Sequence, residues 1–159
     1  MPASPDRSSA RLGRVAGIDY GRARIGVAIS DPDRRVASPH ENYSRAGGEA
    51  DARHFRQLAA DERIVLFVVG LPVHADGGES EMSAEARQFA RWLSDVTSVP
   101  VELFDERYST SEAHELLQQA GVRHKRRKRR LDMLAAQVML SAYLESRSRG
   151  SLPPGPLDA

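Results

Sequence analysis

Apolar residues recur along the chain with two different periods, and these periods predict where strands and helices lie. Short apolar or alternating runs predict five strands, at 15–19, 24–30, 35–43, 64–69 and 100–104. The run at 64–69 is apolar at every position, which is typical of a strand buried on both faces, as in a parallel sheet. The short polar segment between the first two runs predicts a hairpin that joins them.

Longer segments carry apolar residues at helical spacing and predict helices at 49–62, 80–95, 109–120 and 131–146. The third begins with the capping box of Ser109 and Glu112 and stops before Gly121. In the second helix, the stripe expected to face the core is Ala86, Phe89, Ala90 and Leu93. In the last helix, the stripe expected to face the core is Leu131, Leu134, Ala135, Val138 and Ala142.

The order of these elements predicts one α/β domain with a mixed five-stranded sheet flanked by helices. Three strands come first, and the remaining two alternate with helices. A chain of 159 residues is the usual size of a single domain. The domain is expected to span 14–148. The Ser-, Pro- and Arg-rich residues 1–13 and the Pro- and Gly-rich residues 149–159 are expected to be disordered tails.

Composition excludes several classes of protein. Hydrophobic residues make up 40% and charged residues 28%, with a net charge of +1, so wholesale disorder is not expected. The chain has no cysteine, which excludes a disulfide scaffold, a thiolate zinc site and a cysteine nucleophile. No segment is long and apolar enough to span a membrane, and the first residues lack the apolar core of a secretion signal. We therefore expect a cytoplasmic protein that does not associate with membranes.

Carboxylates follow two of the predicted strands, and another begins the last helix. Asp19 ends the first strand, Asp105 and Glu106 follow the fifth, and Asp132 lies early in the last helix. Ligands of open α/β sheets bind where strands end, and Mg²⁺ prefers oxygen ligands. Two such ions about 4 Å apart can activate a water that attacks a phosphodiester. Each acid also has a structural interpretation, in turn chemistry at the strand ends or in the dipole of the helix.

Four segments, in chain order, resemble the motifs of the YqgF/RuvX family. They are Gly17–Asp31, Val69–Pro72 with Asp76-Gly77 after it, Phe104–Thr110 and Leu131–Ala136. The resemblance spans residues 14–147. The family includes RuvC-like nucleases of the Holliday-junction-resolvase type, so the resemblance implies an RNase H-like fold.

The resemblance also implies a catalytic set of Asp19, an acid of the Asp105-Glu106-Arg107 segment and Asp132, which would hold Mg²⁺ or Mn²⁺. Many RNase H-like nucleases carry the second acid at the end of the strand that here reads Val68-Val69-Gly70, where this chain has none. Glu106 is predicted to take that role, and Asp105 is its rival. Consecutive side chains of a strand point to opposite faces, so only one of the two should reach the metal.

The function implied by the resemblance is a metal-dependent nuclease that processes the 5′ end of pre-16S rRNA during ribosome biogenesis. Its partners would be structured RNA and ribosomal particles, and the chain would be a monomer or a homodimer. Two alternatives stay open. One is resolution of Holliday junctions in branched DNA, and the other is a nucleic-acid-binding assembly factor without catalytic activity.

A basic block at 123–130 lies just before Asp132, and the small net charge conceals it. Such a block can neutralise several phosphates, with an affinity that falls as salt rises. Few aromatic residues accompany it, which favours recognition of backbone or shape over base stacking. Arg24 and Arg107 could clamp a scissile phosphate, or could equally form structural ion pairs. The predicted nucleic-acid-binding residues are Arg24, Arg107, Arg123, Lys125, Arg126, Arg127, Lys128, Arg129 and Arg130.

Overall fold

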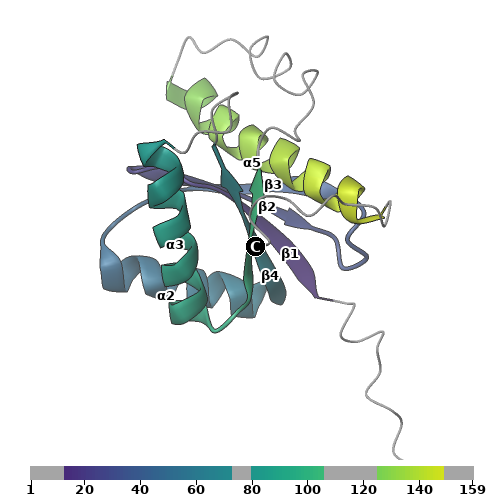
Figure 1. The fold of residues 1–159 in the computed structure, drawn as a ribbon, viewed down its shortest axis with the longest axis horizontal. Helices are drawn as coiled ribbons and strands as arrows, with labels where there is room; N and C mark the ends of the chain where they lie inside the picture. Colours follow the sequence, from purple (N-terminus) through teal and green to yellow (C-terminus); the bar gives the residue numbers. More distant parts are fainter. Residues whose placement is uncertain (1–12, 73–79, 106–124, 149–159) are drawn as a thin grey trace, which may run out of the picture.

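A computed structural model of the chain describes residues 13–72, 80–105 and 125–148 (Figure 1). Within these ranges the strands form one sheet in the order β3-β2-β1-β4-β5. β1 pairs antiparallel with β2, as β2 does with β3, whereas β1, β4 and β5 run parallel. The strands are β1 (Arg14–Asp19), β2 (Arg24–Ser30), β3 (Ala37–Ser44), β4 (Ile64–Leu71) and β5 (Val101–Asp105). The predicted mixed five-stranded sheet is therefore confirmed.

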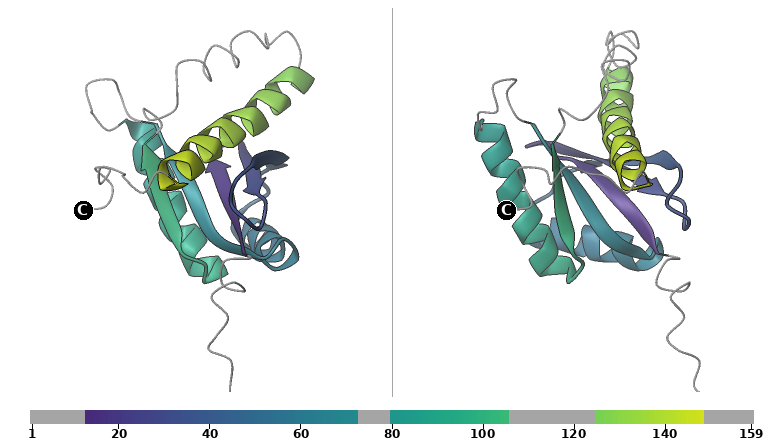
Figure 2. Two further views of the ribbon diagram at one scale, coloured as in Figure 1. Left: turned by 90° about the vertical axis from the view of Figure 1, so that its right-hand side faces the viewer. Right: turned by 45° about the vertical axis from the view of Figure 1, so that its right-hand side comes forward.

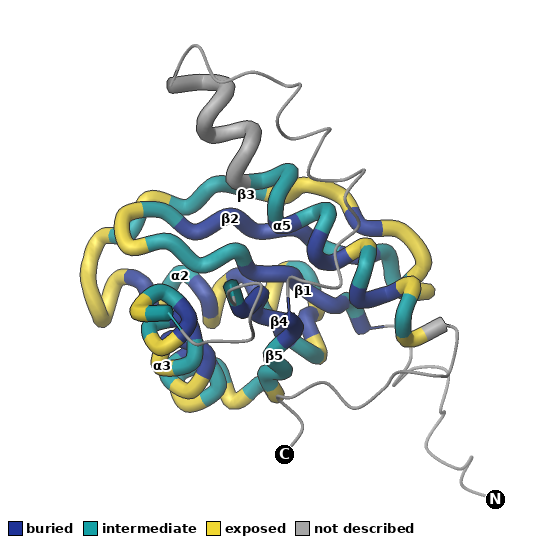
Figure 3. Tube along the Cα trace, turned by 45° about the horizontal axis from the view of Figure 1, so that its top comes forward, coloured by how far each residue is buried: buried dark blue, intermediate teal, exposed yellow. Residues whose placement is uncertain are grey.

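Helices cover both faces of the sheet (Figure 2). Helices α2 (Gly48–Asp61) and α3 (Glu81–Thr97) pack on one face, and α5 (Lys125–Ser148) crosses the other. Each face has its own apolar core, and β1, β2 and β4, which lie between the two cores, are buried along most of their length (Figure 3). The stripe predicted for α3 is confirmed, since Ala86, Phe89, Ala90 and Leu93 are all buried.

Alternation along the strands assigns each position to one of the two faces. In β1, Ala16 and Ile18 belong to the core under α2 and α3, whereas Val15 belongs to the core under α5. In β5, Leu103 packs toward the first core and Phe104 belongs to the second. Because successive side chains of a strand point to opposite faces, the same alternation extends to the strand ends.

The third strand begins at Ala37, later than predicted. The Oδ1 atom of Asp31 accepts hydrogen bonds from the backbone N–H groups of Arg35 (2.7 Å) and Val36 (2.9 Å). These bonds hold the segment before Ala37 in a turn, so it does not join the sheet. The predicted helix at 109–120 and the predicted tails, apart from Gly13, lie outside the described residues, and the domain bounds of 14–148 stay a prediction.

Helix α5 begins at Lys125 rather than at Leu131, so the second part of the basic block is helical. The apolar stripe predicted for this helix is wrong for Leu134, Ala135 and Val138, whereas Ala142 packs against the core and the side chain of Leu131 lies outside the described residues. The residues that α5 buries are Ala136, Met139, Leu140, Tyr143 and Leu144, whereas Leu134, Ala135, Val138 and Ala142 are only partly buried. The segment is apolar on several sides, so periodicity alone did not select the buried one.

A close approach to β1 selects the buried side of α5. A Cβ atom built on Gly17 would lie 2.8 Å from the Cβ of Leu140 and 3.3 Å from the backbone oxygen of Ala136. Such distances show that the helix backbone sits almost against the strand, which only a residue without a side chain permits.

Among the described helices, none combines the length and the apolar character needed to cross a bilayer.

Candidate active site at the carboxyl edge of the sheet

Asp19 is the last residue of β1, the central strand of the sheet. It follows Ile18, which belongs to the core under α2 and α3, so alternation assigns Asp19 to the α5 face. The residue is half-buried. Ile18 is in register with Val69, and the residue level with Asp19 on β4 is therefore Gly70. A glycine at this position places no side chain of its own beside the carboxylate.

Helix α5 runs antiparallel to β1 along this face. Its later residues Tyr143 and Leu144 share a core with Val15, whereas Ala136 and Leu140 lie against Gly17. One helical turn before Ala136 on the same stripe is position 132, about 6 Å back along the helix axis. Asp19 lies two residues beyond Gly17, also about 6 to 7 Å along the strand. The backbones thus bring position 132 level with Asp19.

Asp105 is assigned to the opposite face of the sheet from Asp19. It is the last residue of β5, only 2% exposed, and in register with Leu71 of the core under α2 and α3. Glu102 and Phe104 contact α5, so alternation assigns Asp105 to the opposite face from Asp19. Of the two candidates for the second metal ligand, Asp105 is therefore on the face of the sheet that does not carry Asp19.

Two of the predicted ligands, Glu106 and the side chain of Asp132, lie outside the described residues. In the part of the chain that is described, no group of three carboxylate or imidazole side chains is arranged to hold a metal ion. The predicted metal set stays a prediction, with one of its three members described in full.

Arg24 shares the face and the edge of Asp19. It is the first residue of β2, which runs antiparallel to β1 and so begins where β1 ends. Ile25 and Val27 belong to the core under α2 and α3, which assigns Arg24 to the α5 face. Of the other predicted nucleic-acid-binding residues, Arg107 and Arg123 lie outside the described residues. The backbone of 125–130 forms the first turns of α5, which extend past the sheet (Figure 2).

A buried polar network on the α2 side of the sheet was missed by the sequence analysis. Asp51 is 1% exposed and accepts hydrogen bonds from the hydroxyl of Tyr43 (2.7 Å), the backbone N–H of Ala46 (2.8 Å) and Nε of Arg45 (3.3 Å). Burial alone would raise the pKa of Asp51, but these bonds outweigh it and lower that pKa below its usual value. No periodic pattern distinguishes Asp51 from an ordinary acid in a first helical turn.

This network reaches the turn that follows Asp19. The guanidinium of Arg45 lies 5.6 Å from the ring centre of Tyr20 and 5.7 Å from that of Phe89. On the outer side of the turn, Arg22 donates to Glu85 of α3 at 2.6 Å, and this hydrogen bond lowers the pKa of the Glu85 carboxyl. Both sets of contacts tie the turn to α2 and α3, which fixes the backbone position from which Asp19 projects.

Comparison with solved structures identifies the fold class of this chain. The chain resembles the structure of Thermus thermophilus RuvC in complex with a Holliday junction substrate, with a TM-score of 0.57 and 14% identity, over 89% of this chain and 99% of that one. It also resembles the fowlpox virus resolvase in a complex with Holliday junction DNA, with a TM-score of 0.51 and 9% identity, over 84% and 98% of the two chains. The fold is that of the RuvC-like resolvases, which is RNase H-like.

Sequence comparison then identifies the family. The RuvX family model, described as a Holliday junction resolvase, matches residues 13–146. A Rhodopirellula baltica protein named "Putative pre-16S rRNA nuclease" is 50% identical over 141 residues, which cover 88% of this chain and 82% of that protein. A Nitrosomonas europaea protein of the same name is 40% identical, over 89% and 95% of the two chains. The chain belongs to the RuvX family, which confirms the predicted family, fold and nuclease class.

Proposed function

We propose that this chain hydrolyses phosphodiester bonds in structured nucleic acid with the help of a divalent metal ion, and that its substrate is the 5′ end of pre-16S rRNA in the cytoplasm. The observation that carries the proposal is the position of Asp19. This carboxylate ends the central strand on the α5 face, beside Gly70 and level with position 132 of α5. The names of the relatives support the choice of substrate.

The metal ligands in this proposal are Asp19, Glu106 and Asp132. Glu102 and Phe104 contact α5, and Asp105 belongs to the other face. If the alternation of β5 continues for one residue, position 106 is on the same face as Asp19 and α5. This pattern supports Glu106 over Asp105 as the second ligand. A set of carboxylate oxygens suits Mg²⁺ or Mn²⁺, which are hard cations.

The residues around this site would have different roles in hydrolysis. A bound Mg²⁺ would supply an activated water and stabilise the charge of the leaving oxygen. Asp19 is held in place by the paired strands on either side, β2 and β4. Arg24, on the same edge and face, would bind an oxygen of the scissile phosphate and orient it. The basic turns of α5, together with Arg107 and Arg123, would bind neighbouring phosphates along the backbone.

One alternative function has support of its own. The description of the RuvX family and the fold shared with RuvC favour resolution of branched DNA. Ribosomal particles would be partners of the enzyme under the main proposal, and also of an assembly factor that binds RNA without cutting it. A resolvase cuts two strands related by symmetry, which favours a dimer, whereas a single site suffices to trim one RNA end.

The experiment is a cleavage assay with two substrates, a pre-16S rRNA fragment that keeps its 5′ extension and a four-way DNA junction. The proteins are the wild type, Asp19→Asn and the control Asp95→Asn, which changes an exposed carboxylate of α3. We expect the wild type and the control to cut the RNA with Mg²⁺ and not with a chelator. Replacing a metal ligand slows catalysis more than replacing a residue that only supports a ligand. We therefore expect the Asp19→Asn variant to cut the RNA at least about 100-fold more slowly than the wild type.

Other results would change the proposal in defined ways. Equal cutting by Asp19→Asn would remove this residue from the site. Cutting of the junction alone would replace the RNA substrate with branched DNA. Tight RNA binding without cleavage, in Mg²⁺ and in Mn²⁺, would leave only the assembly factor.

A further inference from the structure

The turn that joins β1 to β2 separates two residues of the candidate active site. Asp19 is the last residue of β1, and Arg24 is the first residue of β2. The four residues between them, 20–23, form the turn. Asp19 is in register with Gly26, so Arg24 lies about 7 Å further toward the carboxyl edge of the sheet. The conformation of this turn therefore determines how Asp19 and Arg24 lie relative to each other.

Arg45, the residue that follows β3, contacts the turn at both of its ends. Its backbone N–H donates to the carbonyl oxygen of Ala23 at 2.9 Å, next to Arg24. Its Nη1 donates to the hydroxyl of Tyr20 at 3.4 Å, next to Asp19, and its guanidinium lies 5.6 Å from the centre of the Tyr20 ring. One residue thus holds the turn beside each of the two site residues.

The guanidinium of Arg45 is itself anchored on a buried carboxylate of α2. Its Nε donates to Oδ2 of Asp51 at 3.3 Å. The other oxygen of this carboxylate, Oδ1, accepts from the hydroxyl of Tyr43 at 2.7 Å and from the backbone N–H of Ala46 at 2.8 Å. The guanidinium also lies 5.7 Å from the ring centre of Phe89 on α3. The position of Arg45 is therefore fixed by α2 and α3, and the turn is held relative to those helices.

These contacts lie on the opposite side of the sheet from the proposed chemistry. Tyr20 and Tyr43 pack against the core under α2 and α3, whereas alternation assigns Asp19 to the α5 face. The proposed function has both the metal ion and the RNA on the α5 face. Arg45 would therefore affect the reaction through the backbone of the turn, without touching the metal ion or the RNA.

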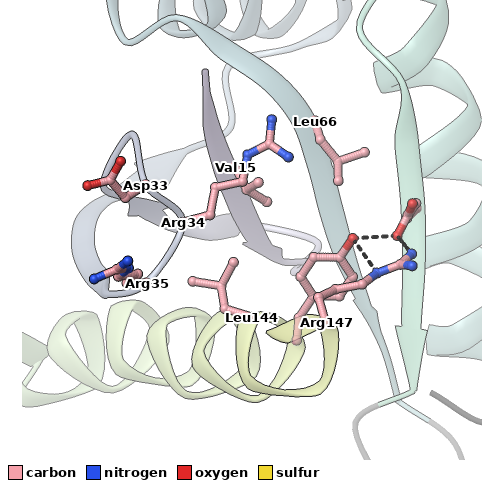
Figure 4. A pocket seen from close by; sticks show the side chains of 9 residues that line it. Val15, Asp33, Arg34, Arg35, Leu66, Leu144 and Arg147 are labelled. Atoms are coloured by element: carbon pink, nitrogen blue, oxygen red, sulfur yellow. Dashed lines mark hydrogen bonds and ion pairs between the residues drawn. The ribbon is translucent and has the colours of Figure 1, made fainter. Parts of the chain in front are cut away.

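Two other arginines bridge elements at the opposite end of the sheet. Nη1 of Arg14 donates to Glu62 at 2.9 Å, and its side chain is 34% exposed, close to the 29% of Arg45. Nη2 of Arg147 donates to Glu102 at 2.8 Å, beside a pocket of about 520 Å³ (Figure 4). Val15, which also lines this pocket, lies about 13 Å before the end of β1. Arg14 therefore provides a matched control, an ion pair of similar exposure far from the turn.

We propose that Arg45 is a positioning residue of this nuclease, which holds the turn at 20–23 so that Asp19 and Arg24 keep the relative placement that hydrolysis needs. The inference rests on the proposed function, in which Asp19 binds the metal ion and Arg24 orients the scissile phosphate. Displacement of a reacting group by about 1 Å can slow a reaction about 100-fold. A loosened turn would therefore lower the rate although every metal ligand is still present.

The first measurement is the steady-state cleavage of the pre-16S rRNA fragment by the full chain with Mg²⁺. Arg45→Met removes the charge and the side-chain hydrogen bonds, and should lower kcat at least about 10-fold. KM should stay as in the wild type, because Arg45 touches no substrate. Arg14→Met makes the same substitution at the control position. It should lower the midpoint of thermal unfolding, as Arg45→Met does, and leave kcat unchanged.

Arg45→Lys tests whether charge alone explains the effect, and it carries the test if Arg45→Met does not fold. Lysine keeps the charge, but its single nitrogen cannot replace both Nε toward Asp51 and Nη1 toward Tyr20. We therefore expect Arg45→Lys to lower kcat as well, by at least about 3-fold. A wild-type kcat in Arg45→Lys would show that charge, rather than the position of the turn, is what matters, and would overturn the proposal.

A second measurement follows the turn without any activity. The backbone amide resonances of Asp19 and Arg24 are recorded by NMR in the full chain, with neither metal nor RNA. Arg45→Met should shift both resonances, although its contacts lie on the other face of the sheet. Arg14→Met should shift neither. If the wild type cuts neither the RNA nor the DNA junction, the proposed function fails, and these resonances alone decide whether Arg45 holds the turn.

The remaining outcomes separate the two claims. A wild-type kcat in Arg45→Met would overturn the positioning role and leave the nuclease assignment in place. Unshifted resonances of Asp19 and Arg24 in Arg45→Met would overturn the positioning role whatever the wild type cuts. An equal loss of kcat in Arg14→Met would overturn it too, because the loss of any ion pair between elements would then explain the effect.

Discussion

Gly17 determines how closely α5 lies on β1, and so how near position 132 comes to Asp19. Gly17→Ala would add a Cβ within 2.8 Å of the Cβ of Leu140, and the backbone oxygen of Ala136 is also near. Since neither neighbour is the end of a flexible side chain, the helix must shift. We expect the free energy of unfolding to fall by about 1 to 3 kcal/mol, as for other overpacked cores. Urea denaturation followed by circular dichroism measures this change.

The control for this change is Gly48→Ala, at the start of α2. No atom lies within 4 Å of a Cβ built on Gly48. Alanine there should leave stability unchanged or raise it by about 0.4 to 1 kcal/mol, because it lowers the entropy of the unfolded chain. An unfolding midpoint for Gly17→Ala equal to that of the wild type would show that the helix is not held this closely.

Asp51 gives the molecule a stabilising contribution that depends on pH. Its pKa is lowered in the folded protein, below the value near 3.9 of an unfolded chain. Stability from this carboxylate is therefore complete above about pH 4 and is lost as pH falls through the folded pKa. We expect Asp51→Asn to destabilise the fold by roughly 1 to 3 kcal/mol at pH 7, because a buried carboxylate with three donors is removed.

Denaturant curves at several pH values measure this effect. The stabilities of the wild type and Asp51→Asn should converge as the pH falls below about 4. Tyr43→Phe, which removes one of the three donors, should show a smaller loss at pH 7. A difference between wild type and Asp51→Asn that stays constant from pH 7 to pH 3 would contradict the role of a charged carboxylate.

At the scale of single residues, the sequence predicted the position of Asp19 at the end of a strand, and its role in the site stays a prediction. Asp19 terminates an apolar strand, and this break is visible in the sequence. Asp51 lies in the first turn of a helix, where acids are common, and its burial comes from the packing of β3 and α2.

At the scale of elements, helix α5 separates what periodicity can predict from what it cannot. The helix itself was predicted, and its buried side was not. Its second half is apolar on several sides, and the close approach to Gly17 selects among them. The helix also continues through residues 125–130, where basic side chains obscure any apolar period.

The first turns of α5 give a prediction about nucleic-acid binding. Arg126 and Arg130 are one turn apart on this helix, and under the proposed function both bind phosphates. Changing both to Gln should make the plot of log affinity against log salt less steep, by about 0.7 to 0.9 for each phosphate that the variant no longer neutralises. Fluorescence anisotropy with a labelled RNA, from low to high salt, measures the slope.

The matched control changes Arg53 and Arg91, which are exposed on α2 and α3 on the other face of the sheet. This variant loses the same amount of positive charge. Its plot of log affinity against log salt should have the same slope as that of the wild type. An equal change of slope in both variants would show that net charge, rather than α5, determines binding.

At the scale of the whole molecule, the order of strands and helices was sufficient to predict the mixed sheet and its two helical layers. The position of side chains relative to those layers was not predictable in the same way. Alternation becomes informative only when one residue of a strand is known to face a given helix, as Phe104 faces α5. Once this is known, alternation along β5 assigns Asp105 to the opposite face of the sheet from Asp19, which the sequence alone left open.

The central claim is that Asp19, Glu106 and Asp132 hold one divalent ion on the α5 face. Its most direct measurement is a Mn²⁺ titration of the full chain, with free Mn²⁺ followed by electron paramagnetic resonance. The account predicts that Asp19→Asn, Glu106→Gln and Asp132→Asn each weaken Mn²⁺ binding at least about 10-fold, whereas Asp105→Asn and Asp95→Asn do not. Binding by Asp19→Asn equal to that of the wild type, or loss of binding in Asp105→Asn with retention in Glu106→Gln, would contradict it.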